Sequence, residues 1–105
     1  MPRATRKERS MALFETLLKL ESPEECCAFL EDLCTPNELR AMEQRFDVAV
    51  CLEKNMLYLD ILEKTGASSA TVSRVRRAML DGGNIVRDVI KRFDLVESDL
   101  KDKSV

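Results

Sequence analysis

Apolar side chains recur along this chain at intervals of three and four residues, the spacing that places them on one face of an α-helix. The clearest example follows Pro23, where the apolar positions are Cys26, Phe29, Leu30, Leu33 and Cys34. The same spacing predicts six helices, over residues 6–20, 23–34, 36–54, 58–64, 69–80 and 85–93. The expected fold class is therefore all-α.

Short polar signals mark where these helices begin and end. The segments Ser22-Pro23-Glu24-Glu25 and Thr35-Pro36-Asn37-Glu38 each place a capping hydroxyl before a proline at the first helical position, and a glutamate three residues after the cap. Asn55 tolerates the left-handed backbone conformation that ends a helix. The glycines of Asp81-Gly82-Gly83-Asn84 are expected to separate the last two helices.

The composition is that of one small globular domain. Of the 105 residues, 45% are hydrophobic and 34% are charged, which is too apolar for a disordered chain. Aromatic residues make up only 5%, and this favours helices over sheets. We expect a basic tail over residues 1–9, a helical domain over residues 10–93 and a charged tail over residues 94–105.

The charge is unevenly distributed along the chain. A net charge of −2 argues by itself against a nucleic-acid partner. However, residues 65–80 contain three arginines and no acid, whereas residues 21–32 contain five acids and no base. A molecule polarised in this way still offers a basic face to phosphates.

No chemistry for catalysis or metal binding is evident in the sequence. It has no histidine, no glycine-rich phosphate loop and no nucleophile elbow. No apolar stretch has membrane-spanning length. The cysteines form no C-x-x-C pair and are expected to be reduced packing residues: Cys26, Cys27, Cys34 and Cys51. We therefore expect a cytoplasmic protein that needs no cofactor and is not an enzyme.

Residues 58–80 have the pattern of a helix-turn-helix. Such a motif needs a residue with positive φ in its turn, and Gly66 supplies it. Ser68 is placed to cap the second helix. The residues expected to pack the two helices together are small or apolar, namely Ile61, Leu62, Ala67, Val72 and Val75.

The outer side of the second helix is suited to duplex DNA. Ser69, Ala70 and Ser73 are short, so the backbone approaches base edges; serine hydrogen-bonds to bases and alanine contacts the thymine methyl group. Arg76 and Arg77 lie further along the helix and are expected to bind phosphates, as are the N–H groups at its start. The full expected set is Ser68, Ser69, Ala70, Thr71, Ser73, Arg74, Arg76 and Arg77.

Residues from about 10 to 93 resemble the Trp repressor superfamily, and within it the TrpR-related YerC/YecD branch. The segments that carry the resemblance are Glu25-Cys26, Phe29, Asp32-Leu33-Cys34-Thr35, Asn37-Glu38, Gln44-Arg45, Tyr58, Thr65-Gly66-Ala67-Ser68 and Ala70-Thr71-Val72-Ser73-Arg74-Val75. The resemblance implies a six-helix chain that forms an intertwined homodimer. Two-fold symmetry would match a palindromic operator, with half-site centres about 34 Å apart or a multiple of that distance.

The resemblance also implies a candidate ligand site. In tryptophan-sensing members two arginines clamp the amino acid, and their positions here are Arg45 and Arg74, with Thr35 and Thr71 near the same pocket. The glycine that makes room for the indole ring in those members is replaced by Val75. A branched side chain there would clash with a flat ring in a packed slot. The effector is therefore expected to be another small molecule, or none.

Three hypotheses follow from the sequence. The first is a homodimeric repressor that occupies its operator, without a response to tryptophan. The second adds a small-molecule corepressor bound by Arg45 and Arg74. The third is a protein–protein interaction module whose acidic second helix binds a basic partner, and it predicts no binding to duplex DNA even at low salt.

Overall fold

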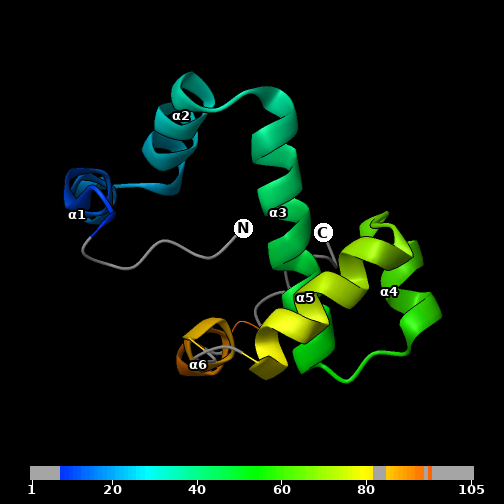
Figure 1. Cartoon of the computed structure of the whole chain (residues 1–105). Helices are drawn as coiled ribbons and strands as arrows, with labels where there is room; N and C mark the ends of the chain where they lie inside the picture. The colour runs from blue at the N-terminus through cyan, green and yellow to red at the C-terminus, as the bar shows by residue number, and fades with distance from the viewer. Residues whose placement is uncertain (1–7, 82–84, 94, 96–105) are drawn as a thin grey trace. The chain divides into compact units, whose positions relative to one another are not determined.

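The structure, a computed structural model, describes residues 8–81, 85–93 and 95 (Figure 1). Its helices are α1 (Met11–Lys19), α2 (Pro23–Leu33), α3 (Pro36–Glu53), α4 (Tyr58–Thr65), α5 (Ser69–Asp81) and α6 (Ile85–Arg92). The described residues contain no strand, so the all-α prediction is confirmed. Most of both expected tails, and residues 82–84 of the expected interruption, lie outside the described residues.

The chain divides into two compact units, residues 1–39 and residues 40–105. Helices α1 and α2 and the first residues of α3 belong to the first unit. The remainder of α3 and helices α4, α5 and α6 belong to the second.

Helix α1 begins at Met11, about one turn later than the sequence analysis predicted. Ser10 has an extended backbone with φ −86° and ψ 109° and stands as the N-cap. The preceding residues 6–9 are all charged, so they offer no apolar side chain whose burial would favour extending the helix. The expected start near residue 6 was therefore wrong.

The predicted caps of α2 and α3 are present. Ser22 Oγ accepts a hydrogen bond from the Glu25 N–H at 3.0 Å. The Glu25 carboxylate accepts from the N–H of Glu21 at 2.9 Å, one residue before the position expected for a capping box. At the start of α3 the exchange is reciprocal: Thr35 Oγ1 accepts from the Glu38 N–H at 3.1 Å, and Glu38 Oε1 accepts from the Thr35 N–H at 2.7 Å.

Helices α1 and α2 have no buried residue, although both carry the apolar stripes that the spacing predicted. Leu18 is 89% exposed and Leu33 is 60% exposed. Phe14 is exposed as well. Part of the apolar stripe of the first unit is thus exposed, while other members such as Phe29 and Leu30 are half-buried.

The core of the second unit is built where α3 contacts the three helices that follow it. Its buried residues are Val48, Ala49, Val50 and Cys51 of α3, Ile61 of α4, Ala67 of the turn, Val72, Val75 and Met79 of α5, and Ile90 of α6. Helical spacing places Val86 and Phe93 on the same side as the buried Ile90, yet both are exposed. Helix α6 is eight residues long, ends at Arg92 and buries only the side chain of Ile90.

Asn55 ends α3 as predicted. Its φ is 60°, in the left-handed region. The N–H of Met56 donates to the Cys51 carbonyl at 3.2 Å, and the N–H of Asn55 donates to the Leu52 carbonyl at 3.0 Å. These two bonds form a Schellman motif, which satisfies the last carbonyl groups of the helix and directs the chain toward α4.

None of the helices in the described ranges is long and apolar enough to span a membrane.

Candidate nucleic-acid interface

The turn between α4 and α5 has the backbone conformation that the sequence predicted. Gly66 has φ 70° and ψ 8°, and its N–H donates to the Leu62 carbonyl at 2.9 Å. A left-handed residue with this bond ends α4 and lets the chain reverse toward α5. Glycine adopts this conformation without the steric cost that a Cβ atom adds.

A side chain from α3 holds the same turn in place. Gln44 Nε2 donates to the Thr65 carbonyl at 3.2 Å. Thr65 Oγ1 donates to the Ile61 carbonyl at 2.7 Å and accepts from the Ala67 N–H at 3.1 Å. The polar groups of the turn are therefore bonded on both sides of Gly66. This role of Gln44 was not predicted, because no local pattern in the sequence links it to residues so far along the chain.

The inner side of the motif is packed as expected. Ile61, Ala67, Val72 and Val75 are buried, and Leu62 is partly buried against the same core. These side chains pack one side of α5 against the core that the other helices of the second unit form. The opposite side of the helix is consequently the one that faces solvent.

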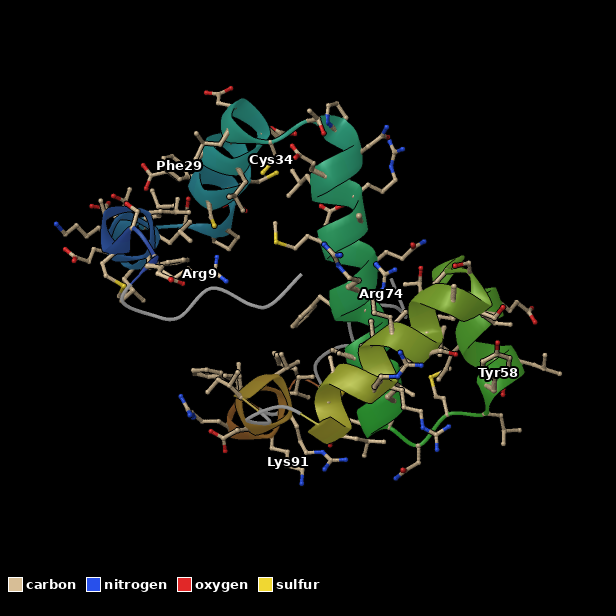
Figure 2. All side chains as sticks on the ribbon, in the orientation of Figure 1. Arg9, Phe29, Cys34, Tyr58, Arg74 and Lys91 are labelled. Carbon is tan, nitrogen blue, oxygen red and sulfur yellow. The ribbon has the colours of Figure 1, made fainter. Side chains whose placement is uncertain are left out.

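Most of the residues expected to contact DNA lie on that exposed side. Thr71 is half-buried, and the exposed members are Ser68, Ser69, Ala70, Ser73, Arg74, Arg76 and Arg77. Figure 2 shows the side chain of Arg74 extending from α5. The structure brings all eight residues together at the start and along the outer side of one helix.

Two of the eight have their side chains engaged in capping the helix. Ser68 Oγ accepts from the Thr71 N–H at 3.1 Å, and the two hydroxyls are hydrogen-bonded to each other at 3.0 Å. This is the predicted N-cap of α5. Ser68 and Thr71 thereby hold the first turn in shape, while the neighbouring Ser69 and Ser73 are exposed.

The arginines of α5 are exposed and carry no ion pair with any residue in the described ranges. Arg45 is likewise exposed and has no ion pair with Glu38, Glu43 or any other residue in the described ranges. Unpaired guanidinium groups on a solvent-facing helix are available to an anionic partner.

The candidate ligand residues belong to different units. Thr35 lies in the first unit and forms the capping box with Glu38. Arg45 and Arg74 lie in the second unit and are exposed. Val75, which replaces the glycine of tryptophan-sensing members, is buried in the core of the second unit, so its side chain fills space that a glycine would leave open.

A hollow of about 360 Å³ lies beside α5. Ser73 and Arg76 line it together with residues of α3, α4 and α6. Glu53 also lines it and pairs with Arg87, the Arg87 Nε donating to Glu53 Oε1 at 2.6 Å. The side chain of Glu53 is only 9% exposed, so this acid does not lie on a solvated helix face.

The four cysteines differ in how far they are buried. No group of three metal-binding side chains is found within the ranges that the structure describes. Cys51 is buried, while Cys26 and Cys34 are half-buried. Cys27 is exposed, which the expectation of four packing positions did not anticipate.

The model of the Trp repressor protein family matches residues 8–94. The chain belongs to the Trp repressor family. One relative is the uncharacterized protein YerC of Bacillus subtilis strain 168. The two sequences are 38% identical over 91 residues, which span 87% of this chain and 88% of YerC.

Two solved structures share the Trp repressor fold with this chain. A candidate Trp repressor from Staphylococcus aureus is 36% identical with a TM-score of 0.78, covering 87% of this chain and 96% of that one. A TrpR-like protein from Eubacterium eligens is 41% identical with a TM-score of 0.80, covering 88% of this chain and 98% of that one. The Trp repressor family is a family of DNA-binding regulators rather than of enzymes. The resemblance seen in the sequence and the all-α Trp repressor-like fold are thus both confirmed.

Proposed function

We propose that this chain is a sequence-specific DNA-binding transcriptional regulator, a repressor that acts by occupying its operator in the cytoplasm. The observation that carries the proposal is the two-sided character of α5. Val72 and Val75 are buried on one side, while Arg74, Arg76 and Arg77 are exposed and without ion pairs among the described residues. A helix held in this way presents a fixed basic surface to the major groove.

The residues of α5 divide into two roles. Ser69, Ala70 and Ser73 are exposed near the start of the helix, where short side chains allow close approach to base edges. Arg76 and Arg77 bind backbone phosphates and supply affinity that does not depend on sequence. Ser68 and Thr71 keep the first turn in shape, so that the N–H groups at the helix start point toward a phosphate.

The regulator acts as a homodimer on a palindromic operator. The exposed apolar side chains of α1 and α2, such as Phe14, Leu18 and Leu33, support this part of the proposal. Exposed apolar patches of this kind mark surfaces that another protein chain covers. A two-fold axis repeats the reading helix at half-sites about 34 Å apart or a multiple of that distance.

Tryptophan is not the effector. Val75 is buried where tryptophan-sensing relatives have a glycine, and its two methyl groups leave no slot for an indole ring. Titration calorimetry with tryptophan tests this point, and no heat of binding is expected. Heat that disappears in Arg45→Ala and Arg74→Ala would instead support a corepressor-gated repressor.

The decisive experiment selects bound fragments from a pool of genomic DNA and then measures affinity for the recovered palindrome. Ser69→Ala, Ser73→Ala and Arg77→Ala are compared with Arg40→Ala, which removes an exposed arginine from α3. Ser69→Ala and Ser73→Ala should each weaken binding by about 1–3 kcal/mol where a base contact is lost. Arg77→Ala removes a phosphate contact and should weaken binding to every duplex sequence alike. The Arg40 variant should bind as the unchanged protein does.

Unchanged affinity in all three α5 variants would overturn this assignment of the reading helix. Absence of binding to any duplex at low salt would overturn DNA binding altogether. That second result would favour an interaction module built on the acidic α2, because phosphate contacts are strongest at low salt.

A further inference from the structure

The hollow beside α5 brings together two arginines from different helices. Arg76 reaches it from α5 and Arg87 from α6. Glu53 is the one acid that lines it within the described ranges, so the charged side chains around the hollow are two arginines and one glutamate. Ser73 of the reading helix lines the same hollow. The site is therefore weakly cationic and adjoins the proposed DNA-reading face.

Glu53 fixes the position of the Arg87 guanidinium. The bond at 2.6 Å uses the Nε atom of Arg87, which leaves the two terminal nitrogens of the guanidinium for another acceptor. Glu53 itself is 9% exposed, whereas the Arg87 side chain is 42% exposed. The acid is thus covered and already bonded, and the arginine is the member of the pair that reaches solvent.

We propose that a phosphate of the DNA backbone occupies this hollow, held jointly by Arg76 and Arg87. The inference rests on the proposed function, because it takes the duplex to lie against α5. Arginine suits this task, since its fixed planar donors bind phosphate oxygens two at a time. Tyr58 and Asn55 also line the hollow and add a hydroxyl and an amide to its rim. Helix α6 thereby becomes part of the DNA contact and widens the footprint beyond the helix-turn-helix.

Salt dependence of duplex binding tests the proposal. Arg87→Ala and Arg76→Ala are compared with Arg92→Ala, which removes an arginine from α6 that is paired with Asp88 at 2.6 Å and does not line the hollow. All three changes alter the net charge equally. Loss of one phosphate contact should reduce the slope of log affinity against log salt by about one. We expect this reduction for Arg87→Ala and Arg76→Ala and not for Arg92→Ala.

A measurement on the unchanged protein guards against misfolding of the Arg87 variant, which leaves Glu53 without its partner. In the full chain labelled with nitrogen-15, the guanidinium Nε–H signals of Arg76 and Arg87 should shift saturably when duplex is added. The signal of Arg92 should not move. A parallel titration with inorganic phosphate separates a small anion from the DNA backbone as the source.

The outcomes separate this inference from the function on which it rests. Suppose that the unchanged protein binds duplex, that its Arg87 Nε–H signal stays as still as that of Arg92, and that Arg87→Ala has the same salt slope as Arg92→Ala. The inference would then be overturned, while the assignment of α5 as the reading helix would stand. Saturable shifts with inorganic phosphate and none with duplex would also overturn it. Failure of the unchanged protein to bind any duplex would overturn the proposed function itself.

Discussion

The side-chain amide of Gln44 donates to the backbone carbonyl of Thr65 and so ties the long helix α3 to the turn of the helix-turn-helix. This contact spans 21 positions of the chain. It comes from outside the motif, whereas the bonds that Thr65, Gly66 and Ala67 make to Ile61 and Leu62 and within the turn are local. The orientation of α5 therefore depends on α3 as well as on Gly66.

Replacing Gln44 with methionine should loosen this turn. Methionine is similar in length but donates no hydrogen bond, so the partly buried carbonyl of Thr65 loses its partner at a cost of about 1 kcal/mol. Hydrogen exchange should become faster at the Ala67 N–H, and duplex affinity should fall. Glu43→Met, at the exposed neighbouring position, is the matched control. Equal exchange rates in the two variants would show that the contact does not hold the turn.

Gly66→Ala should lower the free energy of unfolding by about 1–2 kcal/mol, as measured by urea denaturation. The cause is the backbone, because φ is 70° and an added Cβ would meet only Gln44 Nε2, at an ordinary 3.9 Å. Gly66→Asn should be less costly, since asparagine tolerates the left-handed region. An alanine variant as stable as the unchanged protein would mean that the turn has relaxed to another conformation.

The cap of α5 gives a test with an adjacent control. Ser68→Ala removes the acceptor for the Thr71 N–H and should cost about 1 kcal/mol of unfolding free energy. Ser69→Ala removes the same atom from an exposed position one residue later and should change stability by less than about 0.5 kcal/mol. Thermal denaturation of both variants measures the difference. Equal midpoints would contradict the assignment of Ser68 as the cap.

Glu38 should make the stability of the protein depend on pH. The Thr35 N–H, and after it the Thr35 hydroxyl, hold the pKa of the Glu38 carboxyl below its ordinary value of 4.5. A lowered pKa in the folded state means that the ionised form stabilises the fold above the ordinary pKa, and that this contribution is lost as the pH falls through the lowered value.

Glu38→Gln should therefore be less stable than the unchanged protein at neutral pH, and the difference should shrink as the pH falls below the ordinary carboxyl pKa. Urea denaturation across this range measures it. Glu43→Gln, which neutralises an exposed acid of the same helix, is the control. A difference between Glu38→Gln and the unchanged protein that stays constant with pH would exclude the carboxylate as its source.

What the sequence predicted correctly depends on neighbours in the chain. Gly66, Ser68 and Asn55 act on their own backbone or on residues within a few positions, so their residue types indicate the conformation directly. The buried faces of α4 and α5 follow from helical spacing. For the same reason the outer side of α5, and with it the candidate DNA-contacting set, was accessible from sequence alone.

The remaining contacts join residues that are distant in sequence. The bond between Gln44 and Thr65 and the pair between Glu53 and Arg87 span 21 and 34 positions, and no periodic pattern links such residues. Helical spacing likewise identifies the apolar side of α6 but not how much of it is covered. Phe93 lies on that apolar side and is nevertheless exposed.

The pairing of Glu53 with Arg87 constrains how this protein can diverge. A carboxylate that is 9% exposed is costly without a positively charged partner, so loss of the arginine alone would leave an isolated charge in a poorly hydrated place. Replacement of the acid alone carries no such penalty. Across related genes the two positions should then change in a fixed order, with the acid neutralised before the base disappears.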